Sequence, residues 1–137
     1  MNRRLARLRS VQALYQMDIT DVDADQAIKN SMLEDEEADE FLISAVHGVW
    51  EHLVEIDERL VDQLEHWTLE RVGNVDRAIL RECVHEMLYV PDIPLHVSVN
   101  EAIELAKAFG GVEAGKFVNG VLSNILSDCE REGRESE

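Results

Sequence analysis

Apolar residues recur along most of the chain at intervals of three and four, the spacing of an amphipathic α-helix. The first stretch with this pattern lies next to the N-terminus, and its apolar positions are Leu5, Leu8, Val11, Tyr15 and Ile19. A longer one runs from Phe41 to Trp67, where we expect one long helix or two with a bend near Asp57. Between them, residues 18–40 hold ten acidic residues and one lysine, which indicates a solvated surface with a short helix around residues 24–30.

A central, well-buried helix is predicted over residues 75–89, because its apolar residues cover a wide arc of the helix surface. Asn74 is expected to be its N-cap. Pro91 and Pro94 end the helix, since proline lacks the backbone N–H that an α-helix needs.

The next stretch carries two conflicting signals. Residues 93–99 alternate apolar with other residues, which is typical of a strand. However, Pro94 suits the first turn of a helix, and residues 98–101 have the form of a capping box. We therefore predict a helix that ends at residues 110–111, two glycines, followed by a last helix over about residues 118–129.

These elements predict an all-α fold, a compact bundle of about seven helices. One domain over residues 1–130 is expected, with sub-bundles at about 1–72 and 73–130. The chain has 137 residues and is 45% apolar, enough for a hydrophobic core. No apolar run reaches the roughly 20 residues that span a bilayer. The charged tail, residues 131–137, lacks apolar anchors and is expected to be disordered.

Charge is strongly segregated along the chain. Four of the 13 basic residues lie in the first nine positions, namely Arg3, Arg4, Arg7 and Arg9. The other 9 basic residues face 29 acidic ones, a balance of −20 over residues 10–137. A basic arm on an acidic body can still bind a phosphate backbone locally, and a flexible arm that orders on RNA is one interpretation. Two alternatives stay open: pairing of the arginines with acidic residues of the same chain, and anchoring to an anionic membrane face.

No motif indicates catalysis. Residues 110–116 fit the phosphate-loop pattern, but a phenylalanine follows where serine or threonine would hold magnesium, and a helix precedes it instead of a strand. Glu82 and His85 have the Glu-x-x-His spacing of di-iron bundles, which need two copies, and only one occurs here. We therefore expect a non-enzymatic protein with no catalytic residue, no metal and no cofactor.

Two features bear on the cellular compartment. Cys83 and Cys129 match no metal or redox spacing, and two such thiols suit a reducing cytosol. The stretch from Leu5 to Tyr15 is interrupted by charged and polar residues, which excludes a secretory signal. A mitochondrial presequence stays open, although such segments are usually rich in serine. The expected location is the cytoplasm.

Five motifs occur in order from the arginine-rich arm to the last helix. They are Arg7-Leu-Arg-Ser-Val-Gln-Ala-Leu-Tyr15, Val75-Asp-Arg-Ala-Ile-Leu-Arg81, Ile93-Pro, Val99-Asn-Glu-Ala-Ile-Glu-Leu-Ala-Lys-Ala-Phe-Gly110 and Lys116-Phe-Val-Asn-Gly-Val-Leu122. Together they resemble the NusB family of bacterial transcription antitermination factors, and the last two are the most specific. Residues 18–70 resemble the family mainly in pattern.

The resemblance implies an all-helical fold of two small bundles that binds boxA, a short single-stranded RNA element of ribosomal-RNA leader transcripts. The implied protein partner is NusE, a small-subunit ribosomal protein, with NusA, NusG and RNA polymerase in the wider complex that suppresses termination. By match to the family's motifs, the RNA contacts are Arg4, Arg7, Gln12, Tyr15, Glu86, Glu113, Lys116 and Phe117. Contacts to the protein partner are expected from Asp76, Arg81 and Glu82.

Two other roles are compatible with the fold. It also resembles the RNA-binding front of certain rRNA cytosine methyltransferases, but we expect no catalytic domain after it, which makes that role the less favoured one. From the residues alone, the runner-up is a structural or self-associating helical protein whose arm pairs with its own acidic surface. A homodimer therefore stays open.

Overall fold

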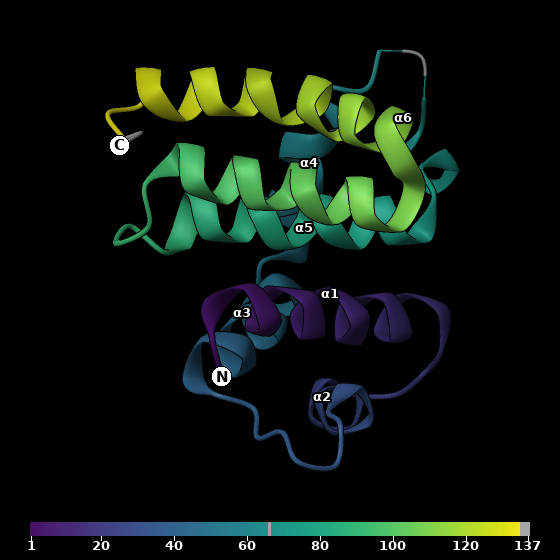
Figure 1. Ribbon diagram of the computed structural model, residues 1–137. Helices are drawn as coiled ribbons and strands as arrows, with labels where there is room; N and C mark the ends of the chain where they lie inside the picture. Colours follow the sequence, from purple (N-terminus) through teal and green to yellow (C-terminus); the bar gives the residue numbers. More distant parts are fainter. Residues whose placement is uncertain (66, 135–137) are drawn as a thin grey trace.

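The computed structural model describes residues 1–65 and 67–134, and this part of the chain is helical without any strand (Figure 1). In chain order the elements are α1 (Arg3–Ile19), α2 (Ala24–Ser31), α3 (Glu40–Glu51), α4 (Leu53–Val61), the 3-10 helix η1 (Leu69–Arg71), α5 (Asn74–Tyr89) and α6 (Leu95–Arg131). The predicted all-α fold is confirmed. The helical interpretation of residues 95–99, made against a strand signal, is also correct.

Side-chain caps begin the first three helices. Asn2, Asp23 and Asp39 each accept a hydrogen bond of 2.8–2.9 Å from the backbone N–H three residues further along. Each bond satisfies one of the N–H groups that a helix start leaves without a partner. Since the Asn2 cap lets α1 begin at Arg3, the basic arm forms about the first two turns of a helix and is not a flexible segment.

Two helix boundaries differ from the expected ones. The long apolar stretch breaks at His52 and not near Asp57, and the His52 ring stacks on that of Tyr89 in α5 with 4.1 Å between centroids. Gly73 is the N-cap of α5, and Asn74 is the first residue of that helix. The Asn74 side chain accepts a hydrogen bond from Arg77 within the first turn and so does not cap the helix.

A single residue divides α6 into two helical segments. Gly111 has φ 78° and ψ −169°, a backbone conformation that favours glycine because it has no Cβ. In Figure 1 the two segments run back along one another from this point, so the described part holds seven α-helical segments in all. The predicted capping box is wrong: Pro94 is the N-cap, and Ser98 lies inside the helix with its hydroxyl donating to Glu86.

The central position predicted for α5 is confirmed. Figure 1 shows α1, α2 and α3 on one side of α5, with α4 and both segments of α6 on the other. Ten of the residues of α5 are buried, including the ionisable Arg81, Glu82, His85 and Glu86. The division into sub-bundles at residues 72 and 73 stays a prediction, and α4 packs with α5 and α6 in this arrangement.

The C-terminal end is more ordered than the expectation of disorder from residue 131. Helix α6 continues to Arg131, and residues 132–134 close it with a Schellman motif. In this motif the N–H of Gly133 donates to the carbonyl of Glu130, and the N–H of Arg134 donates to that of Cys129, both at 3.0 Å. The remainder of the predicted disordered tail, residues 135–137, lies outside the described residues.

Candidate nucleic-acid interface

The N-terminal arginines all engage groups of the same chain. Three of them donate two hydrogen bonds each to one carboxylate: Arg4 to Glu101, Arg7 to Glu86, and Arg9 to Glu36. The guanidinium of Arg3 lies over the Phe41 ring, 4.1 Å from its centroid. The intramolecular pairing that the sequence left open is therefore present in the structure.

Arg7 and Glu86 form a buried ion pair at the junction of three helices. Their side chains are 5% and 1% exposed, and the two hydrogen bonds measure 2.8 and 2.9 Å. Ser98 of α6 donates a third bond of 2.7 Å to Glu86. Burial acts to raise the pKa of Glu86, but hydrogen bonds from Glu82, Arg7 and Ser98 outweigh it and lower that pKa. Both residues were predicted to contact RNA, and the structure places them in the interior.

The residues predicted to contact the protein partner are largely enclosed. Glu82 is buried beside Glu86, and burial, reinforced by the charge of Glu86, raises the pKa of Glu82 well above its ordinary value. Arg81 is also buried and donates two bonds of 2.9 Å to Asp57. Asp76 alone is half-buried, and burial raises its pKa.

A shallow hollow lies between α1 and α2 beside Tyr15, whose side chain is 36% exposed. Its volume is about 450 Å³, and its lining includes Gln12, Asn30 and Ser31. Gln12 is half-buried and accepts a 2.9 Å hydrogen bond from Arg9. Tyr15 and Gln12 thus share one surface, with an aromatic face beside amide groups that can bind base edges.

The third group of predicted residues lies on the second segment of α6. Lys116 and Glu113 are exposed, with 3.8 Å between their charged atoms. Phe117 is half-buried against the core and lines a hollow of about 380 Å³ together with Lys116 and Trp67. Figure 1 places this segment across α5 from α1, so these residues lie apart from the predicted RNA contacts on α1.

Two residues of these surfaces were not singled out from the sequence. Trp67 is 56% exposed and lies beside Phe117. In the sequence it ends the apolar pattern that begins at Phe41, which indicates a core residue. Its exposure could have been expected only from the charged residues around it and from the break at Gly73 that follows. Glu101 was interpreted as part of a capping box, and no local pattern connects it to an arginine 97 positions earlier.

The other motifs carry no recognisable chemistry in the fold. The phosphate-loop pattern at residues 110–116 includes the reversal at Gly111 and continues as the start of the second helical segment of α6. Across residues 1–65 and 67–134, no cluster of three or more His, Cys, Asp or Glu side chains has the arrangement of a metal site. In the same part of the chain no helix is long and apolar enough to cross a membrane.

Comparison with known proteins gives a consistent result. The model of the NusB family matches residues 4–127. The transcription antitermination protein NusB of Shouchella clausii (strain KSM-K16) is 57% identical over 124 residues, which cover 90% of this chain and 93% of that protein. The protein of the same name from Bacillus subtilis (strain 168) is 53% identical over 131 residues, covering 96% and 99%.

The solved structures to which this fold is similar also contain NusB proteins. NusB of T. maritima is 38% identical with a TM-score of 0.85, over 93% of this chain and 92% of that one. A complex of the antitermination factors NusB and NusE with dsRNA contains a chain that is 27% identical with a TM-score of 0.82, over 92% and 96%. The relatives are antitermination factors, in agreement with the interpretation as a binding protein and not an enzyme. The chain therefore belongs to the NusB family.

Proposed function

We propose that this chain is a transcription antitermination factor that binds single-stranded boxA RNA together with NusE in the cytoplasm. Support comes from its relatives, which are antitermination proteins, and from the structural neighbour that was solved with NusE and RNA. NusA, NusG and RNA polymerase complete the proposed assembly on ribosomal-RNA leader transcripts.

The observation that carries the RNA part of the proposal is the first turn of α1. Arg3 and Arg4 are exposed there, on a chain whose net charge is −16. Guanidinium groups hold phosphates without reading the base sequence, so these residues suit the RNA backbone. Further along the same helix, Tyr15 offers a ring on which an unstacked base can lie.

The residues predicted from the motifs take different roles in this proposal. The accessible ones, Arg4, Gln12, Tyr15, Glu113 and Lys116, contact RNA directly. Arg7 and Glu86 act from beneath as positioning residues, because their buried pair fixes α1 against α5 and α6. Phe117 joins Trp67 as a second aromatic surface beside Lys116.

The residues predicted to contact NusE also divide into accessible and buried ones. Asp76 is accessible enough to touch a partner, and it lines a hollow of about 240 Å³ with Trp67, Arg71 and Phe117. Arg81 and Glu82 support that surface from within α5. A homodimer would be a competing state, and sedimentation at several protein concentrations distinguishes it from the complex with NusE.

The test is a titration of a boxA-like single-stranded RNA with the protein alone and with NusE, over a series of salt concentrations. Three accessible cations, Arg3, Arg4 and Lys116, set an upper limit of about 2.1 on the magnitude of the log–log salt slope, at roughly 0.7 for each phosphate contact, because Arg4 already holds the carboxylate of Glu101. Binding that is insensitive to salt and unchanged by NusE would contradict the proposal.

A further inference from the structure

We propose that Glu101 is an internal counter-ion that competes with RNA phosphate for Arg4 and so sets the affinity of the RNA surface. The inference rests on the proposed function, since it concerns how the same first turn of α1 engages RNA. It assigns a role to a residue on α6 that lies outside the predicted set of contacts.

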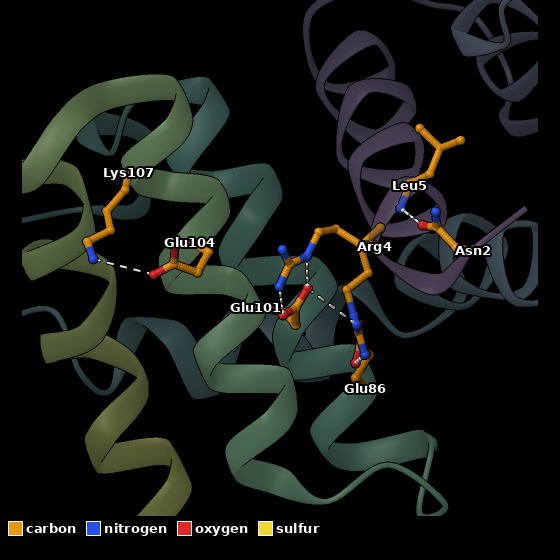
Figure 2. Close-up of polar contacts among 8 residues, drawn as sticks. Asn2, Arg4, Leu5, Glu86, Glu101, Glu104 and Lys107 are labelled. Atoms are coloured by element: carbon orange, nitrogen blue, oxygen red, sulfur yellow. Dashed lines mark hydrogen bonds and ion pairs between the residues drawn. The ribbon is translucent and has the colours of Figure 1, made fainter.

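The geometry of the pair is that of a guanidinium bound to an oxyanion. Nε of Arg4 donates to Oε1 of Glu101 at 3.1 Å, and its Nη2 donates to Oε2 at 2.8 Å. Figure 2 shows the two side chains facing one another between α1 and α6. A phosphate group presents two oxygens in much the same way, so it can occupy the same donors.

The Arg4–Glu101 pair is much more exposed to solvent than the neighbouring Arg7–Glu86 pair. The Arg4 side chain is 75% exposed and that of Glu101 is 18% exposed, whereas the values for Arg7 and Glu86 are 5% and 1%. An incoming phosphate can reach Arg4 from solvent, but it cannot reach Arg7. Of these two pairs, the one between Arg4 and Glu101 is therefore exchangeable.

Glu101 does not lose all of its cationic surroundings when Arg4 leaves. Its Oε1 lies 3.8 Å from Nη1 of Arg7, which Glu86 holds in place. The hydrogen bond from Arg4 lowers the pKa of Glu101, so the carboxylate is charged at neutral pH. The exchange thus moves one guanidinium from a carboxylate to a phosphate while the carboxylate stays beside Arg7.

This exchange makes the contribution of Arg4 to RNA binding small in the native protein. One ion pair is broken for each one formed, so a phosphate gains Arg4 only when other contacts already hold the RNA nearby. Without the carboxylate, the same arginine would be free for any phosphate. Glu101 is in this sense a positioning residue that suppresses indiscriminate binding.

A matched control is available one turn further along α6. Glu104 carries the same charge, and its carboxylate lies 3.4 Å from the ammonium of Lys107 (Figure 2). It influences Arg4 only through its charge at a distance. Glu104→Gln therefore removes the same unit of charge as Glu101→Gln and leaves the bonds of Arg4 in place.

The experiment measures binding of two labelled RNAs of equal length, a boxA-like strand and oligouridylate, to the full chain with NusE present. Glu101→Gln should tighten binding of both RNAs by about two- to fivefold, the range expected for loss of one exposed ion pair. Glu104→Gln should change binding less than twofold. In an Arg4→Ala background, Glu101→Gln should have no more effect than Glu104→Gln.

Thermal unfolding is measured for each variant as a control for folding. If Glu101→Gln does not fold, Glu101→Asp replaces it in the experiment. The shorter aspartate side chain cannot accept both hydrogen bonds from Arg4. Unchanged or weakened binding by the Glu101 variant would overturn the inference, as would a gain that persists without Arg4. Failure of the native protein to bind either RNA would instead contradict the proposed function.

Discussion

Arg77 of α5 is joined to Asp18 at the end of α1 by an ion pair whose shortest distance, from Nη2 to Oδ2, is 2.7 Å. The same guanidinium donates to the backbone carbonyl of Leu69 at 2.9 Å, which attaches η1 to the two helices. One side chain of α5 thus connects this helix to both α1 and η1.

Arg77→Ala should lower the free energy of unfolding by about 1–3 kcal/mol, because the carbonyl of Leu69 loses a donor and Asp18 keeps only Arg81, 3.4 Å away. Urea denaturation followed by circular dichroism measures the change. Arg71→Ala is the control, since Arg71 is exposed, and it should stay within about 0.5 kcal/mol of the native value. Equal effects of the two variants would contradict the structural role of Arg77.

Gly48 of α3 is required by the close approach of His85. A Cβ at this position would lie 2.2 Å from Nε2 of that buried imidazole, so Gly48→Ala should destabilise the protein by about 1–3 kcal/mol through overpacking. At Gly120, where nothing lies within 4 Å of the added Cβ, alanine should instead stabilise by about 0.5–1 kcal/mol because it is the better helix former. Thermal melts of both variants test the opposite signs.

The buried carboxyl of Glu82 predicts a loss of stability as the pH rises. Burial raises its folded-state pKa well above the ordinary 4.5, so the folded chain retains a proton that the unfolded chain releases. The stability that Glu82 contributes is therefore complete below its unfolded pKa and is lost as the pH rises through its folded pKa.

Glu82→Gln keeps a hydrogen-bond donor beside Glu86 and removes this titration. The difference in unfolding free energy, native minus variant, should fall as the pH rises above the ordinary carboxyl pKa of 4.5. Urea denaturation at several pH values measures it, and a difference that is constant across the series would show that Glu82 is ionised in the folded protein.

Tyr15→Ala should weaken boxA binding by about 1–3 kcal/mol, the cost of losing one base–aromatic stack, if the hollow beside Tyr15 holds a base as proposed. Tyr15→Phe keeps the ring and should retain most of the affinity. Because stacking is not electrostatic, the salt slope should stay the same in both variants. A changed slope would mean that Tyr15 acts through a phosphate contact.

The helices could be predicted from the sequence because their periodicity is local. The apolar arc of residues 75–89 was sufficient to identify α5 as the central helix. The pairing of charges was beyond such an argument, since Arg7 and Glu86 are 79 positions apart and no spacing along the chain shows that α1 lies on α5. For the same reason Arg7 could be taken from its motif as an RNA contact, although its guanidinium is enclosed.

The bend at His52 shows a second limit. Apolar periodicity continues through this position, so the sequence placed no break there. The interruption coincides with stacking of His52 on Tyr89, a contact between residues of two different helices. The helix propensity of the residues near His52 cannot predict a contact that forms only when α5 packs against them.

The reversal at Gly111 gives the fold a single point on which its closure depends. Without that residue's positive φ, the 37 residues of α6 would form one rod of about 55 Å at 1.5 Å per residue. The side chains of Val118, Leu122 and Ile125, now buried, would then project away from their own core. A side chain with a Cβ at position 111 would strain this reversal, because its positive φ is costly for any residue other than glycine.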